Sequence, residues 1–406
     1  MSIAHTIREK IVAALDSVGV SAASESIVLE HTEVFEHGDY ATNAALAFAK
    51  SLKTNPRALA EKIVAALGSI SGVSKIEIAG PGFINFTLDS AHVAQILDGA
   101  RTNVNEWGKG DSLKGKKIMA EYTDPNPFKE FHIGHLVPNT LGESLSRLYD
   151  FAGAEVKRAN YQGDVGIHVA KSLFILLEKG VTEPTIEDLA TAYPEGSKRY
   201  DEDPEAKKVI DELNRTIYSK TEATINTLYE KGRTLSLAHF EELYKILGTK
   251  FDFYFFESAT GPRGVAIVQA HPEIFEESEG AVIFAGEKYG LHTRVFLNKL
   301  GLPTYEAKEL GLAQMKEEAY PFDLTLTITG NEQGEYFKVV MKAMELTLPE
   351  LRGKLAFKTN GMLRFAEGKM SSRTGNVITG ESLLNDLTEV ARKHADVSRS
   401  DDKEML

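Results

Sequence analysis

The alternation of strand-like and helix-like segments between residues 117 and 177 constrains the fold more than any other feature of the sequence. Residues 117–122 and 156–160 are short stretches typical of strands, and a helical pattern follows each of them. Parallel strands need such crossovers. The pattern therefore predicts an α/β domain with a parallel sheet. The inward faces are predicted to hold Leu141, Leu145 and Leu148 in the first helix, and Ile167, Ala170, Leu173, Phe174 and Leu177 in the second.

A smaller unit is predicted before this one, over residues 1–110. It carries three helical patterns, then strand-like runs at 76–78 and 83–88. Pro81-Gly82 lies between the two runs and is typical of a turn. These features predict a small α+β domain.

The α/β domain is predicted to extend over residues 111–350. A polar, helix-favouring stretch at about 180–250 interrupts it and is interpreted as an insertion. Residues 351–406 mix loop and helix patterns. Sheet-like segments resume after the insertion at 251–255, 281–284, 294–297 and 324–328.

Composition excludes several classes of function. The 406 residues include no cysteine, so disulfides, thiolate catalysis, iron–sulfur clusters and cysteine-type zinc sites are excluded. No apolar run reaches the length of about 18 residues that a membrane span needs. The net charge of −13 by itself argues weakly against a nucleic-acid partner, because phosphate binding favours basic surface.

Two short motifs carry the chemistry. His132-Ile133-Gly134-His135 stands between a predicted strand and a predicted helix, where open parallel sheets bind ligands. Imidazoles at a helix N-terminus can donate hydrogen bonds to phosphate oxygens. Lys369-Met370-Ser371-Ser372-Arg373 suits a loop that clamps a polyphosphate. Taken alone, the first motif is equally consistent with polar residues in the first turn of a helix, whereas the second is a common composition of ordinary exposed surface, which is the interpretation it favours by itself.

Together the two motifs resemble the paired HIGH and KMSKS signatures of the class I aminoacyl-tRNA synthetases, in which both bind ATP. The first match is complete, whereas Ser372 stands where the family usually has its second lysine. The resemblance therefore moves the phosphate-neutralising charge onto Lys369 and Arg373, or onto a cation elsewhere, for which Lys129 is the natural candidate.

The segments around these motifs are similar to those of the arginyl-tRNA synthetases within that class. The run from Glu121 to His135 resembles the family's acidic-aromatic-x-x-Pro-Asn pattern and its lysine before HIGH. Residues 158–166 resemble its R-A-N-x-x-G-D-x-G strand end. Further similar segments are Phe251-Asp252 with Glu257-Ser258, residues 304–309 and residues 330–333. Residues 35–43 and 80–86 resemble the family's N-terminal domain, which contacts the tRNA elbow.

The resemblance implies a Rossmann-like class I catalytic domain that attaches arginine to tRNA(Arg) through an arginyl-adenylate. ATP with Mg²⁺ would be consumed, no resident metal or membrane is implied, and the chain is expected to be a cytoplasmic monomer. The implied catalytic residues are Lys129, His132, His135, Lys369 and Arg373. The implied ATP-binding residues are Pro125, Phe131, His132, Ile133, Gly134, His135, Gly163, Asp164, Gly166, Met370, Ser371 and Ser372.

The same resemblance implies the residues that bind the amino acid and the RNA. Glu121, Asn126, Tyr305, Glu309 and Gln333 would bind arginine, and Phe35, Tyr40, Asn43, Phe83 and Asn85 would bind tRNA. Two carboxylates suit a guanidinium and would not suit glutamate. Glu309 stands where the family commonly has aspartate. A protein with a negative net charge can still recognise tRNA through local basic patches and through the shape of the RNA.

Two alternatives remain open. The chain could be another class I synthetase, such as the glutamate or cysteine enzyme, although the N-terminal motifs and the missing cysteines argue against both. It could also be a non-catalytic RNA- or protein-binding relative. Only 33 residues follow Arg373 (406 minus 373), too few for the family's helical anticodon-binding domain. We expect an excised piece or an incomplete sequence, ahead of a natural short form that works with a partner.

Overall fold

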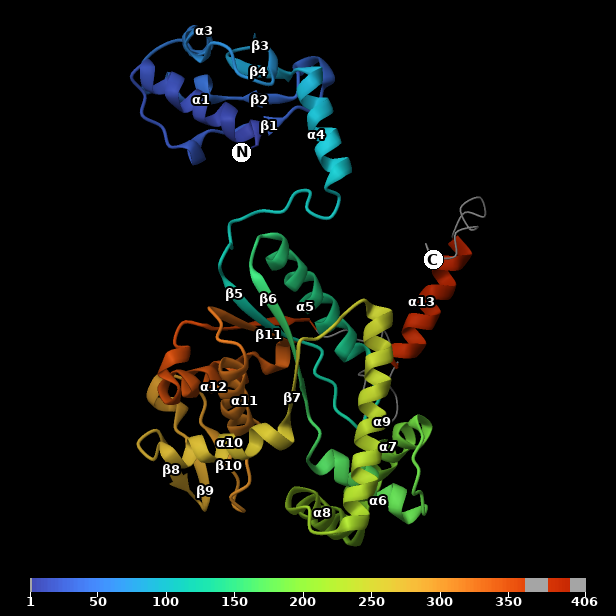
Figure 1. Ribbon diagram of the computed structural model, residues 1–406. Helices are drawn as coiled ribbons and strands as arrows, with labels where there is room; N and C mark the ends of the chain where they lie inside the picture. The colour runs from blue at the N-terminus through green and yellow to red at the C-terminus, as the bar shows by residue number, and fades with distance from the viewer. Residues whose placement is uncertain (1, 362–378, 395–406) are drawn as a thin grey trace. The chain divides into compact units, whose positions relative to one another are not determined.

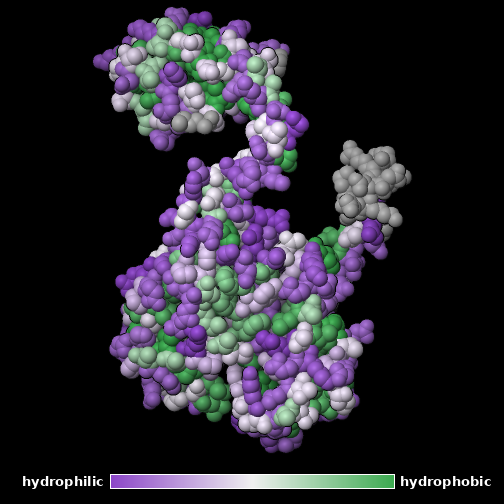
Figure 2. Space-filling view, viewed as in Figure 1, coloured by the Kyte–Doolittle hydropathy of each residue, from purple (hydrophilic) through white to green (hydrophobic). Residues whose placement is uncertain are grey.

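A computed structural model describes residues 2–361 and 379–394, which form two compact units (Figure 1). The first unit is Met1–Gly108 and the second is Lys109–Leu406. The sequence placed this division at about residue 110. Within the described ranges, no helix combines the length and the apolar character that crossing a membrane requires. Hydrophilic side chains dominate the visible surface, with apolar patches between them (Figure 2).

The first unit packs helices against a four-stranded antiparallel sheet with the strand order β1-β2-β4-β3. The predicted hairpin is confirmed, because Ile78 pairs with Ile84 across the Pro81-Gly82 turn. Asn55 caps α3, with Pro56 at its first position, which is where helices tolerate proline. The elements are α1 (Ile3–Ser17), β1 (Leu29–His31), β2 (Tyr40–Thr42), α2 (Ala44–Ala49), α3 (Pro56–Leu67), β3 (Val73–Ala79), β4 (Phe83–Leu88) and α4 (Ser90–Thr102), with 3-10 turns at Ser24–Ser26 and Phe35–His37.

The second unit is built on a five-stranded sheet with the order β12-β11-β5-β6-β7, and every pair in it is parallel. The predicted parallel sheet is therefore confirmed. Its strands are β5 (Lys117–Glu121), β6 (Glu155–Gln162), β7 (Phe253–Phe256), β11 (Leu324–Gly330) and β12 (Leu355–Asn360). The edge strand β12 was not predicted. The surrounding helices are α5 (Ile133–Phe151), α6 (Ile167–Glu178), α10 (Glu257–Ala270), α11 (Tyr305–Ala319), α12 (Gly334–Thr347) and α13 (Gly380–His394).

The polar stretch that interrupts the α/β pattern folds as three helices that share an apolar core with α6. A capping box at Thr185 and Asp188 starts the first of them, and Asp203 caps the second before Pro204. The helices are α7 (Ile186–Glu202), α8 (Pro204–Ser219) and α9 (Ala223–Leu247).

Two of the segments predicted as sheet-like do not join the main sheet. Residues 281–284 and 294–297 are strands, but they pair with each other and with residues 275–278 in a separate antiparallel sheet. This small sheet comprises β8 (Phe275–Ser278), β9 (Ala281–Phe284) and β10 (Arg294–Leu297), with a 3-10 turn at Gly286–Tyr289. Further 3-10 turns lie at Asn331–Gln333 and Pro349–Leu351.

The predicted inward face of α5 is wrong. Leu141 and Leu148 are 38% and 64% exposed, and only the Leu145 side of that face packs inward. The buried face is instead small and polar, because α5 lies close against the end of β5. A Cβ atom on Gly142 would lie 2.1 Å from the ring of Tyr122, so a leucine cannot fit there. In α6, Leu177 is likewise exposed, at 37%.

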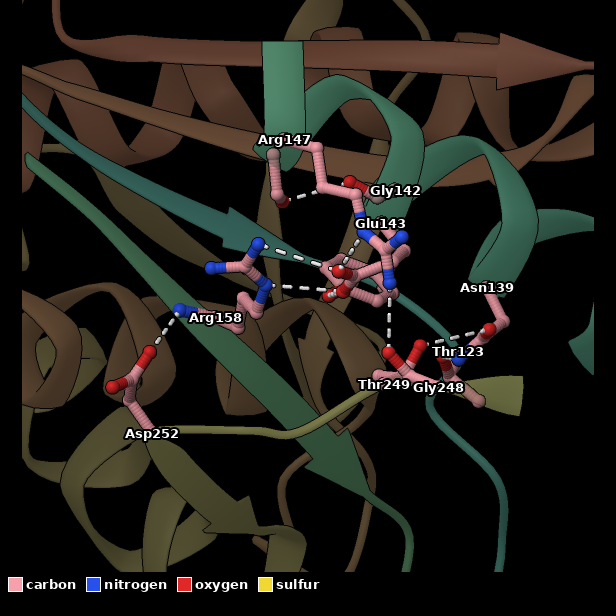
Figure 3. A network of polar contacts seen from close by, with 11 residues as sticks. Thr123, Asn139, Gly142, Glu143, Arg147, Arg158, Gly248, Thr249 and Asp252 are labelled. Atoms are coloured by element: carbon pink, nitrogen blue, oxygen red, sulfur yellow. Dashed lines mark hydrogen bonds and ion pairs between the residues drawn. The ribbon is translucent and has the colours of Figure 1, made fainter. Parts of the chain in front are cut away.

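A buried carboxylate replaces the expected leucines on this face (Figure 3). Glu143 accepts hydrogen bonds from Tyr122, from Arg158 of β6 and from Arg147 one turn further along α5. Arg147 also donates to the carbonyl of Gly248 at the end of α9. This network ties α5, the sheet and the helical insertion together.

Candidate functional site

A cavity of about 360 Å³ opens at the carboxyl ends of β5, β6 and β11. The chain leaves β5 toward β6 on one side, while β11 lies on the other, so this is the point where the strand order reverses. Open parallel sheets bind ligands at such a point. The lining residues are Glu121, Asp124, Asn126, Tyr161, Gly163, Glu257, Arg294, Tyr305, Glu306, Glu309, Thr327, Thr329, Gln333, Tyr336 and Phe337.

The structure brings together every residue that the resemblance assigned to arginine. Glu121 ends β5, Asn126 lies in the following loop, Tyr305 and Glu309 lie one turn apart on α11, and Gln333 precedes α12. These positions span more than 200 residues of sequence, and all five line the one cavity. Tyr305 is 64% exposed, which places it at the rim.

Three of the five carboxylates that line this cavity have a cationic partner. Lys316 forms a buried ion pair with Glu121, and Lys308 Nζ lies 2.5 Å from a carboxylate oxygen of Glu257. Arg294 reaches from the separate antiparallel sheet to within 3.6 Å of Glu306. The close approach of α10 and α11 makes the second pair possible, since a Cβ on Gly264 would overlap the Ala307 carbonyl.

Glu309 and Asp124 complete the set of carboxylates, and neither has an ion-pair partner within 4 Å in the described part of the chain. Burial and the neighbouring charge of Glu121 raise the pKa of Glu309 to about 8. The same two causes raise the pKa of Asp124 well above its usual range. The carboxyl group of Glu309 is therefore largely protonated at pH 7, and a bound cation would displace that proton.

Asp124, Glu257 and Arg294 line the cavity but could not be assigned a role from the sequence, although the first two lie inside segments that resemble the family. Asp124 lies in the run before the histidine motif, and Glu257 lies in the Glu257-Ser258 pair. No sequence pattern indicated that Arg294 lines the cavity, because its strand belongs to the separate sheet and reaches the cavity only through tertiary packing.

The two motif histidines lie at the start of α5. His132 is the N-cap residue and His135 the third helical residue, and each side chain accepts a backbone N–H of this turn. Gly134 N donates to His132 Nδ1, and His132 N donates to His135 Nδ1, both at 3.1 Å. With Nδ1 accepting in both rings, each neutral ring carries its proton on Nε2. The rings stack with their centroids 4.0 Å apart.

Both histidines are uncharged at neutral pH. Burial and the charge of Lys129 lower the pKa of His132 to about 4. Burial and His132 hold the pKa of His135 well below its usual range. Lys129 supplies the positive charge beside them, and its ammonium lies 4.6 Å from the ring centre of Tyr193. The arrangement offers two neutral donors and one cation at a helix N-terminus, which is suited to phosphate oxygens.

The other residues assigned to ATP differ in accessibility. Gly134 is exposed, whereas Pro125 and Phe131 are buried, and Phe131 packs against His135, Phe240 and Tyr244. Ile133 opens α5 and is half-buried.

The Gly163-Asp164 segment has a structural explanation. A Cβ on Gly163 would lie 2.1 Å from Asn126 Oδ1, so a larger residue there would displace the Asn126 side chain from its place in the cavity wall. Asp164 is fully buried and accepts hydrogen bonds from Ser258 and Arg233. Gly166 has a φ of +126°, which favours glycine.

The second motif, Lys369, Met370, Ser371, Ser372 and Arg373, lies outside the described residues. Just beyond it, Thr379 forms a β-bridge with His132, and Gly380 N donates to the Phe131 carbonyl at 2.7 Å. The chain that follows the second motif therefore returns to the first.

In the first unit, the residues assigned to RNA contact differ in exposure. Phe83 is 41% exposed, and Tyr40 and Asn43 are half-buried. Asn85 is only 8% exposed and presents little surface to a partner. The side chain of Phe35 lies outside what the structure describes.

The described ranges contain no preformed metal site. No group of three histidine, aspartate or glutamate side chains there is arranged to hold a metal ion.

Two family models match the chain. The model for "tRNA synthetases class I (R), catalytic domain" matches residues 97–405, and the "Arginyl tRNA synthetase N terminal domain" matches residues 5–88. The first alone covers more than half of the chain.

Curated relatives named arginine–tRNA ligase are 30% identical to this chain. The proteins from Clostridium acetobutylicum and Treponema denticola match 86% and 91% of the chain, which spans 62% and 65% of their own length. The protein from Chromobacterium violaceum matches 100% of the chain, which spans 73% of it.

Solved structures support the fold. Thermus thermophilus arginyl-tRNA synthetase aligns with a TM-score of 0.66 at 22% identity, over 98% of this chain and 72% of that one. The Plasmodium falciparum enzyme aligns with a TM-score of 0.64 at 17% identity, over 96% and 68%.

Proposed function

The chain belongs to the class I arginyl-tRNA synthetase family, and from that premise we propose that it activates arginine with ATP and transfers it to tRNA(Arg). The observation that carries the proposal is the cavity at the switch point of the sheet. It collects all five residues assigned to arginine. Two of its carboxylates, Glu309 and Asp124, have no cationic partner within the described ranges.

Charge complementarity supports arginine as the amino acid. A guanidinium stays protonated at every relevant pH and binds carboxylates through paired hydrogen bonds. Glu309 lies on the helix α11 that also carries Tyr305, so its carboxylate and the tyrosine ring would hold the same end of the substrate. A neutral analogue would leave the Glu309 carboxylate without its partner, at a cost of several kcal/mol or roughly 10³-fold in affinity.

The proposed chemistry needs positioning and charge stabilisation more than a protein base. The arginine carboxylate would attack the α-phosphorus of ATP in line, and pyrophosphate would leave. The Nε2–H groups of His132 and His135 would donate to the phosphate oxygens as charge develops on them, and Lys129 would neutralise that charge. Lys369 and Arg373 would act on the outer phosphates, and Mg²⁺ would arrive with the nucleotide.

The second step would move the arginyl group from the adenylate to the 3′-terminal ribose of tRNA. We propose that the first unit contacts the RNA, with exposed Phe83 and the half-buried Tyr40 and Asn43 as contact residues. The absence of cysteine agrees with the reducing cytoplasm, where we place the protein, as a monomer.

Charging of tRNA tests the proposal. Purified chain is incubated with ATP, Mg²⁺, unfractionated tRNA and a labelled amino acid, and acid-precipitable label is counted. We expect label from arginine and none from glutamate, cysteine or lysine. Label from a different amino acid would assign the chain to another substrate, and RNA binding without charging of any amino acid would support the non-catalytic alternative.

A further inference from the structure

The loop that carries Lys129, the cation beside the motif histidines, is anchored in the helical insertion. Phe128, the residue before it, is fully buried, and its ring belongs to the apolar core that the insertion shares with α6. This ring stacks on that of Tyr229 of α9, with their centroids 6.0 Å apart. A Cβ atom on Gly232 would lie 2.4 Å from the Phe128 ring, so glycine at this position lets α9 approach the ring closely.

The backbone of the same loop is bonded to α9 and to α6. Phe128 has a φ of +66°, a conformation that a bulky residue keeps only where its surroundings hold it. Phe128 N donates to Ser236 Oγ of α9 at 3.0 Å, and Ser172 Oγ of α6 donates to the Phe128 carbonyl at 3.3 Å. These contacts fix the backbone from which the Lys129 side chain extends, three residues before His132.

The ammonium group of Lys129 meets a second helix of the insertion. It lies 4.6 Å from the ring centre of Tyr193 in α7, a residue that is only 7% exposed. The face of an aromatic ring attracts a cation, more strongly where water is excluded. Lys129 forms no ion pair with a carboxylate in the described ranges. The ring can therefore hold the ammonium without neutralising its charge, as a carboxylate would.

The ionisation of Tyr193 agrees with this close contact. Burial raises the pKa of its hydroxyl, yet the pKa lies below its usual value, and the charge of Lys129 is the largest cause of the decrease. Tyr193 lies outside the lining of the amino-acid cavity. Its contact with Lys129 therefore concerns the phosphate side of the site.

We propose that Tyr193 is a positioning residue, whose ring face holds the Lys129 ammonium in place for the phosphates of ATP. The proposal rests on the proposed function. Without the ring, Lys129 keeps its charge but regains rotamer freedom, and a displaced charge stabilises a developing negative charge much less. The helical insertion thus serves the activation step, through α7 and the loop that α9 anchors.

The test is a double-mutant cycle on the full chain, read as the kcat of arginine-dependent pyrophosphate exchange with tRNA present. Lys129→Met should lower kcat by about 100-fold, because a charge on the phosphates is lost. Tyr193→Leu should lower kcat by about tenfold, with the KM for arginine unchanged. In the double variant, kcat should lie within about twofold of that of Lys129→Met, because Tyr193 acts through Lys129.

A conservative variant separates the ring from the hydroxyl. Tyr193→Phe keeps the ring face and should retain at least about half of the wild-type kcat. Thermal melting checks the fold of each variant. If Tyr193→Leu melts early, Tyr193→Met is measured with the same expectation, since methionine adapts to an irregular space in a core.

Tyr200→Leu is the matched control, because Tyr200 lies about two turns further along α7 and its ring also holds lysine ammonium groups. Lys171 and Lys207 lie 4.4 Å and 3.8 Å from its ring centre, and neither is assigned to ATP. This variant should retain the wild-type kcat.

Three results would overturn the assignment while the proposed function stands. Tyr193→Leu could retain the wild-type kcat, or its loss could multiply that of Lys129→Met in full, which would make its effect independent of Lys129. A loss in Tyr193→Phe as large as that in Tyr193→Leu would exclude the ring face as the cause. A wild-type chain that activates no amino acid, even with tRNA, would instead overturn the proposed function and this assignment with it.

Discussion

Lys316 of α11 and Glu121 of β5 form an ion pair at the base of the cavity, with side chains that are only 5% and 2% exposed. The pair joins the central strand of the sheet to the helix that carries Tyr305 and Glu309. The charge of Glu121 is therefore already paired with that of Lys316. The role of Glu121 in substrate binding depends on how Lys316 positions its carboxylate.

Removing the ammonium group of Lys316 should destabilise the folded chain. We expect Lys316→Met to lower the free energy of unfolding by about 3–5 kcal/mol, because it leaves a buried charge without a partner. Urea unfolding measures the change. The double variant Glu121→Gln with Lys316→Met should recover most of the loss. A single variant within about 1 kcal/mol of wild type would show that the pair contributes little.

Arginine binding should release protons through Glu309. Its pKa is raised to about 8 in the empty cavity, so at pH 7 the folded, ligand-free chain holds this proton. A bound guanidinium favours the ionised form, and affinity should therefore rise with pH between about 6 and 8. Charged groups that share this environment are Glu121, Asp124, Glu257, Glu306 and Lys316.

Calorimetry in two buffers of different ionisation enthalpy measures the protons released by arginine at pH 7. We expect about one proton, released from Glu309. In Glu309→Gln the release should fall, and arginine should lose its advantage over neutral citrulline. The same proton count in wild type and Glu309→Gln would assign the proton to another group.

His135→Ala should lower the turnover of arginine activation by at least about tenfold, because a neutral donor to the phosphate is lost. His271→Ala is a suitable control, since His271 pairs with Glu273 at the end of α10, outside the cavity. It should retain wild-type turnover. Unchanged activation in His135→Ala would remove that residue from the site.

Glu143 should be a structural residue. Glu143→Gln weakens hydrogen bonds from Tyr122, Arg147 and Arg158, and we expect a loss of about 2–3 kcal/mol in unfolding free energy. The exposed pair Glu242–Lys245 provides a comparison, where Glu242→Gln should cost less than about 1 kcal/mol. Equal losses in the two variants would contradict the role assigned to the network.

The parallel sheet and the five arginine-pocket residues could be predicted, for different reasons. The strands at residues 117–122 and 156–160 are short and each is followed by a helical pattern, and this alternation favours a parallel sheet. The pocket residues were predicted from the order of the segments that resemble the family, because nothing about Tyr305 or Gln333 alone indicates a binding role. Their shared cavity rests on the parallel register that places Glu121 beside Thr327.

The sequence could not indicate the features that arise from tertiary contact. The pattern of leucines on α5 favoured Leu141 and Leu148, yet close packing against Tyr122 selects Gly142 and Glu143 for the buried side. The pairing of Glu121 with Lys316 joins positions 195 residues apart (316 minus 121), and neither residue type is usually buried. Arg294 reaches the cavity only because its strand belongs to the separate sheet.

The most direct test of the central claim is the exchange of labelled pyrophosphate into ATP by the full chain. It is measured with arginine, glutamate, cysteine and lysine in turn, with and without tRNA. We predict exchange with arginine alone, and only when tRNA is present. Exchange with a different amino acid, or none with arginine and tRNA together, would contradict it.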